Sequence, residues 1–137
     1  MADFLLDSDV VIWHLRGHAA IVELVLMLAR RGRIGLSAIT RAEVLLGMRE
    51  PEREITVRFL DSCETLPVTA ATADRAGEIS RGFRSQGITL PLPDALMGAT
   101  ALLASIPFYT CNPRRYPMPD LDLRPVRPSM PGSIPPT

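Results

Sequence analysis

The chain contains no lysine, and all fifteen of its basic residues are arginines. This absence excludes chemistry that depends on a lysine amine, such as Schiff-base formation or the phosphate-binding lysine of a P-loop. Arginine remains available, and its planar guanidinium group is well suited to binding phosphate.

Cysteine, net charge and long apolar runs are also scarce. Cys63 and Cys111 form neither a disulfide framework nor a metal-binding spacing, which indicates reduced cytoplasmic thiols. The net charge of zero argues against binding nucleic acid through a broad positive field. No apolar run approaches the ~18 residues of a membrane span, and the first residues lack the basic stretch of a secretory signal. We therefore expect a cytoplasmic protein with no membrane attachment.

The 137 residues, 47% of them hydrophobic, are enough for one domain with a substantial core. Apolar segments typical of strands alternate with segments of helical periodicity, which predicts an α/β fold with a mostly parallel sheet. The predicted strands are residues 3–7, 33–37, 64–68, 107–110 and 121–126. The predicted helices are residues 10–16, 19–31, 41–48, 51–61, 70–85 and 96–104.

The composition changes near the end of the chain, where proline becomes frequent. Nine of the thirteen prolines lie from Pro107 onward, and the sequence ends in RPSMPGSIPPT. Such a segment cannot pack a core. We therefore predict a folded domain over residues 1–126 and a proline-rich, disordered tail over residues 127–137.

Three acids lie where predicted strands lead into helices. Asp7 follows the first strand, Glu43 follows the second, and Asp94 opens the helix of PDALMGATALL. Ligand sites of parallel α/β sheets lie at the carboxyl ends of the strands. We therefore expect the three carboxylates to converge on one edge of the sheet.

Each acid also has a purely structural interpretation. Asp7 can cap the helix that follows it, and Thr40 with Glu43 forms the T-x-x-E pattern of a capping box. Asp94 lies in a first helical turn, where a negative charge suits the helix dipole. Only the functional interpretation predicts that the three acids meet.

Three clustered carboxylates repel one another unless a cation lies among them. Mg²⁺ or Mn²⁺ fits best, since hard cations prefer oxygen ligands and the chain has no His/Cys set for zinc. Such a metal activates water and stabilises phosphate charge, which indicates phosphodiester hydrolysis.

The stretch FLLDSDVV resembles the first motif of haloacid-dehalogenase-type phosphatases, in which Asp7 would be a phosphorylated nucleophile and Asp9 its acid/base. That family also needs a later lysine and a late acidic pair. The chain has no lysine, and DALMGA supplies one acid.

Three segments in order resemble the PIN-domain ribonucleases, most closely the VapC-type toxins of toxin–antitoxin pairs: LLDSDVVIWHLRG, LSAITRAEVLLG and LPLPDALMGATALLASIPFYTCN. The resemblance covers roughly residues 3–126. It implies a three-layer α/β/α sandwich with a short, mostly parallel central sheet. It also implies a Mg²⁺- or Mn²⁺-dependent endoribonuclease that cleaves structured RNA, forms a homodimer and is bound by a cognate antitoxin.

Position by position, the resemblance implies that Asp7, Glu43 and Asp94 are metal-binding and catalytic. Asn112 falls in the T-x-N element of Thr110–Asn112 and is implied to be a fourth catalytic residue. Ser8, Arg16, Arg41 and Arg114 are candidates for substrate binding. We expect one firmly held metal, with a second recruited when RNA phosphate supplies ligands.

The chain departs from the family pattern at two further positions. Asp9 replaces a small polar residue, and its place in a first helical turn favours a supporting role over direct metal binding. Arg115 stands where an acid or histidine often follows. With the neutral Asn112, it leaves open a second interpretation, a PIN-like RNA- or protein-binding module that has lost its catalytic site.

Overall fold

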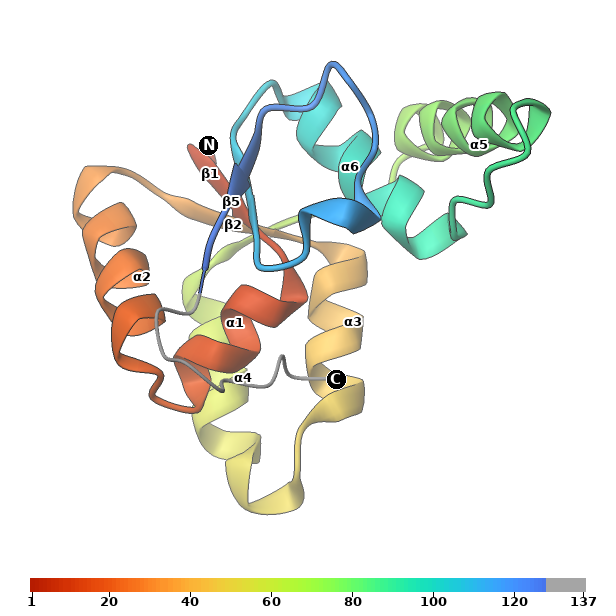
Figure 1. The fold of residues 1–137 in the computed structure, drawn as a ribbon. Coiled ribbons are helices and arrows are strands. Elements are labelled where there is room, and N and C mark those ends of the chain that lie inside the picture. Colours follow the sequence, from red (N-terminus) through yellow and green to blue (C-terminus); the bar gives the residue numbers. More distant parts are fainter. Residues whose placement is uncertain (128–137) are drawn as a thin grey trace.

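The computed structural model describes residues 1–127 and contains a five-stranded sheet in which every strand pair is parallel (Figure 1). The strand order is β3-β2-β1-β4-β5, so β1 lies at the centre. The strands are β1 (Phe4–Leu6), β2 (Ile34–Ser37), β3 (Glu64–Leu66), β4 (Phe108–Thr110) and β5 (Leu123–Pro125). The predicted α/β fold with a mostly parallel sheet is confirmed. Nearly all of the predicted tail lies outside the described residues.

Six α-helices connect the strands, and all of them fall on predicted helices. They are α1 (Ser8–Leu15), α2 (Ala19–Arg31), α3 (Ala38–Gly47), α4 (Arg53–Ser62), α5 (Ala70–Ser85) and α6 (Leu92–Ala104). Two short 3₁₀ turns, η1 (Glu50–Glu52) and η2 (Pro113–Arg115), complete the described elements.

Three helices begin earlier than the sequence predicted: α1 at Ser8, α3 at Ala38 and α6 at Leu92. α6 begins at Leu92 because Pro93 is tolerated in a first turn, where its missing N–H would have no helical partner. α3 begins at Ala38 because the Ser37 hydroxyl accepts a hydrogen bond from the Thr40 backbone N–H at 2.9 Å. The predicted capping box of Thr40 and Glu43 is therefore wrong, and Glu43 is not a cap.

The sheet has a separate core on each face, which confirms the three-layer sandwich. Leu5 and Leu6 alternate across the pleat of β1, so each enters a different core. Leu5 packs with residues of α5 and α6, including Ala76, Ala95 and Met97. Leu6 packs with residues of α1, α2, α3 and α4, among them Val10, Ile21, Val44 and Leu60.

The carboxyl ends of β1, β2 and β4 meet at one edge of the sheet. From β1 the chain runs outward through β2 to β3 and then crosses back to β4 on the other side of β1. A topological switch point therefore lies between β1 and β4. There the Asp7 backbone N–H donates to the Tyr109 carbonyl oxygen at 2.8 Å. This hydrogen bond brings the start of α1 beside the loop that follows β4.

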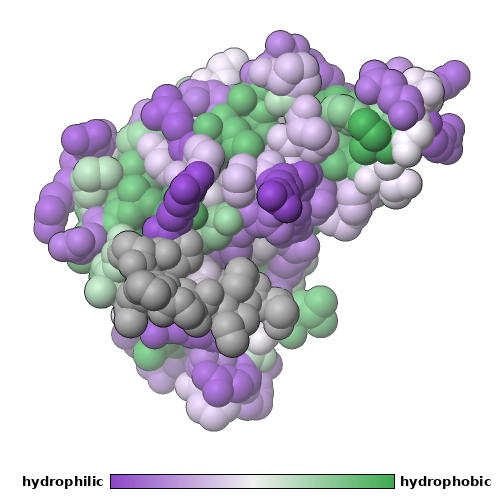
Figure 2. Space-filling model, in the orientation of Figure 1, coloured by the Kyte–Doolittle hydropathy of each residue, from purple (hydrophilic) through white to green (hydrophobic). Residues whose placement is uncertain are grey.

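Among the described helices, no single one is long and apolar enough to cross a membrane. α1 and α2 meet the length and composition of a span only as a pair, which is bent by 110°. On the face shown in Figure 2, hydrophilic side chains divide the hydrophobic surface into separate patches.

Candidate active site

Asp7 is the centre of the candidate site. It follows β1, caps α1, and has a fully buried side chain. Its Oδ1 accepts a hydrogen bond from the Ser8 backbone N–H at 2.8 Å. Its Oδ2 accepts hydrogen bonds from the Thr110 hydroxyl and the Tyr116 phenol, each at 2.8 Å. A carboxylate with three such donors is held in one orientation.

Thr110 and Tyr116 come from the other side of the switch point, at and after the end of β4. The Thr110 hydroxyl also accepts a hydrogen bond from the Asn112 backbone N–H at 3.0 Å. Burial and then the charge of Asp7 raise the pKa of the Tyr116 phenol above its usual range. The phenol therefore stays protonated and donates to Asp7.

Ser8 joins the first strand–helix turn to α3. Its hydroxyl donates to Glu43 Oε1 at 2.9 Å and lies 3.4 Å from Asp7 Oδ1. Glu43 is half-buried and lies on α3, near the carboxyl end of β2. One short polar side chain therefore links two of the three predicted acids.

The third acid, Asp94, is paired with an arginine. Asp94 lies in the first turn of α6, as predicted, and its Oδ1 is 2.6 Å from Arg115 Nη2. Arg115 Nη1 is 3.9 Å from Asp7 Oδ2. The guanidinium group therefore lies between the carboxylates of Asp7 and Asp94.

Asp9 supports the loop after β4. Both of its carboxylate oxygens lie 3.2 Å from the Cys111 backbone N–H. Burial, followed by the nearby charge of Asp7, raises the pKa of the Asp9 carboxyl to about 7. Burial and the charges of Asp9 and Asp7 raise the pKa of the Cys111 thiol to about 12. Cys111 is therefore protonated at neutral pH.

The donor set suits a hard cation. Asp7, Glu43 and Asp94 supply only carboxylate oxygens, and Arg115 shows that the space between two of them accepts a positive charge. As the side chains stand, no three acids, histidines or cysteines within residues 1–127 are grouped closely enough to hold a metal ion. Binding a metal at all three acids would require these side chains to rearrange.

The remaining predicted residues lie at different places. The Asn112 side chain is exposed beside the loop after β4, and Arg114 is exposed on η2. Arg41 pairs with Asp61 at 2.6 Å and is therefore engaged away from the three acids. The roles predicted for these three residues stay predictions.

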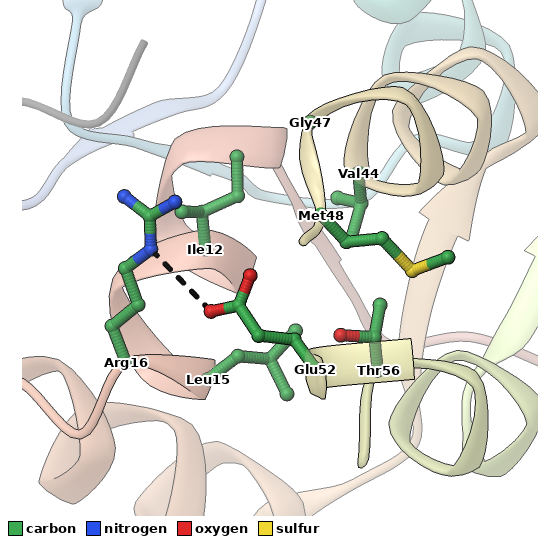
Figure 3. Close-up of a pocket in the computed structure, with 8 residues that line it drawn as sticks. All are labelled: Ile12, Leu15, Arg16, Val44, Gly47, Met48, Glu52 and Thr56. Carbon is green, nitrogen blue, oxygen red and sulfur yellow. Dashed lines mark ion pairs between the residues drawn. The ribbon is translucent and has the colours of Figure 1, made fainter. Parts of the chain in front are cut away.

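Arg16 lies just beyond the carboxyl end of α1, the opposite end from Asp7. Its Nε is 4.0 Å from Glu52, and the pair borders a small cavity between α1, α3 and the start of α4 (Figure 3). The volume of this cavity is about 20 Å³, enough for a single water. The side chains that line it are mainly apolar, including Ile12, Leu15 and Val44.

Sequence reasoning missed two members of the site. Tyr116 gave no signal, because nothing in its local sequence places its phenol on an acid 109 residues earlier. Arg115 was noted only as a departure from a motif, and its ion pair with Asp94 spans 21 residues.

Comparison with known proteins shows the family to which the chain belongs. The family model of the PIN domain matches residues 4–118. Ribonuclease VapC10 of Mycobacterium tuberculosis is 36% identical over 114 residues, covering 83% of this chain and 86% of its own length. Ribonuclease VapC19 of the same species is 34% identical over 119 residues, covering 85% and 95% of the two chains.

Solved structures share the fold at lower identity. VapBC2 of Rickettsia felis, bound to a DNA fragment from its promoter, has a TM-score of 0.80 at 20% identity and covers 90% of this chain and 98% of its own. DNA-bound VapBC of Salmonella typhimurium has a TM-score of 0.77 at 23% identity, with coverage of 91% and 98%. The family model spans most of the chain and the two mycobacterial relatives exceed 30% identity over most of its length, so this chain belongs to the PIN domain family.

Proposed function

We propose that this protein is a metal-dependent endoribonuclease and the toxin of a toxin–antitoxin pair. One observation carries the proposal: Asp7 and Asp94, 87 positions apart in the chain, lie on either side of the Arg115 guanidinium group. The two mycobacterial relatives named as ribonucleases support it. The phosphatase alternative is set aside, because the chain belongs to the PIN domain family and lacks the lysine that a phosphatase would need.

PIN-domain ribonucleases of the VapC type are generally dependent on divalent metal ions. We propose that Asp7, Glu43 and Asp94 hold Mg²⁺ or Mn²⁺ here, with Asn112 lining the same site. When bound, the metal lowers the pKa of a water and stabilises charge on the phosphate. Thr110 and Tyr116 fix the orientation of the Asp7 carboxylate, and Ser8 holds Glu43 beside it, so these two acids are oriented before substrate arrives.

The proposed partners are an RNA substrate, a cognate antitoxin and a second copy of the chain in a homodimer. Structures of VapBC toxin–antitoxin complexes share this fold, which supports the proposal that this chain binds an antitoxin. An apolar groove between α2 and α4 offers one surface for it, with a volume of about 460 Å³ and lining residues that include Val25, Leu26 and Phe59. Such a toxin would act in the cytoplasm, where its RNA substrates are found.

The test is cleavage of a pool of structured RNAs by the full chain purified free of antitoxin. Wild type, Asp94→Asn and Asp74→Asn are compared in Mg²⁺, Mn²⁺ and EDTA. Asp74 is exposed on α5, and no ion pair to it is found in the described part of the chain, which makes it a matched acid-to-amide control. We expect discrete cuts in metal that disappear in EDTA and in Asp94→Asn but persist in Asp74→Asn.

A second candidate function is a PIN-like binding module without catalysis. The observation that favours it is Arg115, a cation placed where the family often has an acid. It predicts no cleavage in either metal, with RNA or protein binding retained. Cleavage that survives in Asp94→Asn would contradict the proposed site and point to a contaminant.

A further inference from the structure

The Arg115 ion pair differs from every other ion pair in the described residues. The side chain of Asp7 is fully buried, that of Asp94 is 9% exposed, and that of Arg115 is 28% exposed. In all the other ion pairs of residues 1–127, both side chains are at least 27% exposed. Exposed ion pairs contribute little to stability, whereas buried carboxylates are poorly solvated and depend on a nearby cation.

Arg115 is also the only side chain in residues 1–127 that donates a hydrogen bond to the Asp94 carboxylate. The guanidinium carbon lies 5.5 Å from the centre of the Tyr116 ring, and Tyr116 itself donates to Asp7. The arginine is thus held by the same cluster that orients Asp7. Without it, two poorly solvated carboxylates would face each other with no cation between them.

We propose that Arg115 is an internal counter-ion that competes with the divalent metal for Asp7 and Asp94. The guanidinium stays charged at any ordinary pH, so it can only move and cannot be neutralised in place. A metal that binds Asp94 through the oxygen now bonded to Arg115 must displace Nη2 from it. The Arg115 side chain is long and partly exposed, so it can turn toward solvent. This inference rests on the proposed function for the identity of the metal.

The test measures metal binding without RNA, by calorimetric titration of Mn²⁺ into the full chain. Arg115→Gln removes the charge, Arg115→Lys keeps it, and Arg75→Gln removes an exposed arginine of α5 as the control. A positive charge beside a carboxylate weakens the binding of a second cation to it by about ten- to a hundred-fold. We therefore expect Arg115→Gln to bind Mn²⁺ more tightly than wild type by that factor. Arg115→Lys should lie close to wild type, and Arg75→Gln should match it.

A melting experiment on the same variants gives a second readout. In EDTA, Arg115→Gln should melt at a lower temperature than wild type, because its carboxylates lack a counter-ion. In Mn²⁺ it should gain more in melting temperature than wild type does. Mn²⁺ affinity that is unchanged or weaker in folded Arg115→Gln would overturn the proposal.

If Arg115→Gln does not fold, an NMR experiment on the wild-type chain tests the proposal. The guanidinium signals of Arg115, identified by their loss in Arg115→Lys, are followed by NMR during titration with Mg²⁺. We expect the restricted rotation of an ion-paired guanidinium to be released at saturation, and an ion pair that persists would overturn the proposal. None of these three measurements uses RNA. If Arg115 does not compete with the metal but the chain cleaves RNA normally, only this inference is refuted. If Arg115 competes with the metal but the chain does not cleave RNA, only the proposed function is refuted.

Discussion

The phenol of Tyr116 donates a 2.8 Å hydrogen bond to Asp7, an acid 109 residues earlier in the chain. The bond ties the segment after β4 to the end of β1. Because the phenol stays protonated, it can only donate to this carboxylate oxygen, and it shares that oxygen with Thr110. Tyr116 is therefore a positioning residue for the central acid of the site.

Replacing Tyr116 with phenylalanine tests this positioning role. Tyr116→Phe removes the hydroxyl while keeping the ring that packs on Phe108. Loss of a hydrogen bond to a buried carboxylate should cost about 1–3 kcal/mol in the free energy of unfolding, measured by denaturant titration. Looser placement of Asp7 should also lower RNA cleavage by roughly tenfold under conditions where the variant is fully folded. Unchanged stability and cleavage would contradict the role.

Two substitutions of Thr110 should differ in their effect on the free energy of unfolding. Thr110→Val keeps the shape but removes one of the two hydroxyl donors to Asp7 Oδ2 and leaves the Asn112 N–H without its acceptor, whereas Thr110→Ser keeps the hydroxyl. We expect Thr110→Val to lower the free energy of unfolding by about 2–4 kcal/mol, and Thr110→Ser to lose roughly 1 kcal/mol from the missing methyl group. Equal losses in the two variants would show that packing, and not the hydroxyl, matters here.

The raised pKa of Asp9 makes the free energy of unfolding in EDTA depend on pH. Its carboxyl has a pKa of about 7 when folded, against an ordinary value of 3.8. Between these values the folded state holds a proton that the unfolded state has lost, so the Asp9 contribution to stability falls as pH rises. Asp9→Asn removes this dependence. From pH 4 to pH 8, wild type should lose on the order of 2–4 kcal/mol relative to Asp9→Asn.

The exposed control for this experiment is Asp74→Asn, whose stability should follow the wild-type pH curve in parallel. If Asp9→Asn also runs parallel to wild type, then Asp9 is charged in the folded protein at neutral pH. That result would contradict the burial argument.

Gly35 and Gly77 predict opposite effects of the same substitution. A Cβ added at Gly35 in β2 would lie 2.6 Å from the Ala2 Cβ and 2.8 Å from Leu66 Cδ1, whereas one at Gly77 in α5 meets nothing within 4 Å. Gly35→Ala should destabilise the protein by about 1–3 kcal/mol because the sheet must shift. Gly77→Ala should stabilise it by about 0.5–1 kcal/mol through helix propensity. Thermal melts of both variants test the packing of β2.

Much of the fold follows from local patterns in the sequence. The apolar run around Leu5 and Leu6 and the periodicity of residues 19–31 specify a buried strand and a helix, because each pattern repeats with the period of its element. Helix starts were less predictable. Ser37 and Thr40 compete to cap α3, and only the backbone geometry shows that Ser37 does so.

The placement of the three acids was predictable from the sequence, but their surroundings were not. Asp7, Glu43 and Asp94 each follow a recognisable local pattern, and strand order then determines how near they come. The contacts of Tyr116 and Arg115 with Asp7 depend on tertiary packing across more than 100 residues, which no local pattern records. Only the structure shows that the Arg115 guanidinium lies between Asp7 and Asp94.

The most direct test of the central claim is the position of the metal itself. Crystals of the antitoxin-free chain would be soaked in Mn²⁺, and the anomalous signal of manganese would be located. We expect a peak bonded to carboxylate oxygens of Asp7 and Asp94 at about 2.1 Å, with Arg115 turned away from Asp94. A manganese bound elsewhere, or none at saturating Mn²⁺ with the ion pair of Arg115 and Asp94 intact, would contradict a metal-dependent nuclease centre built on these acids.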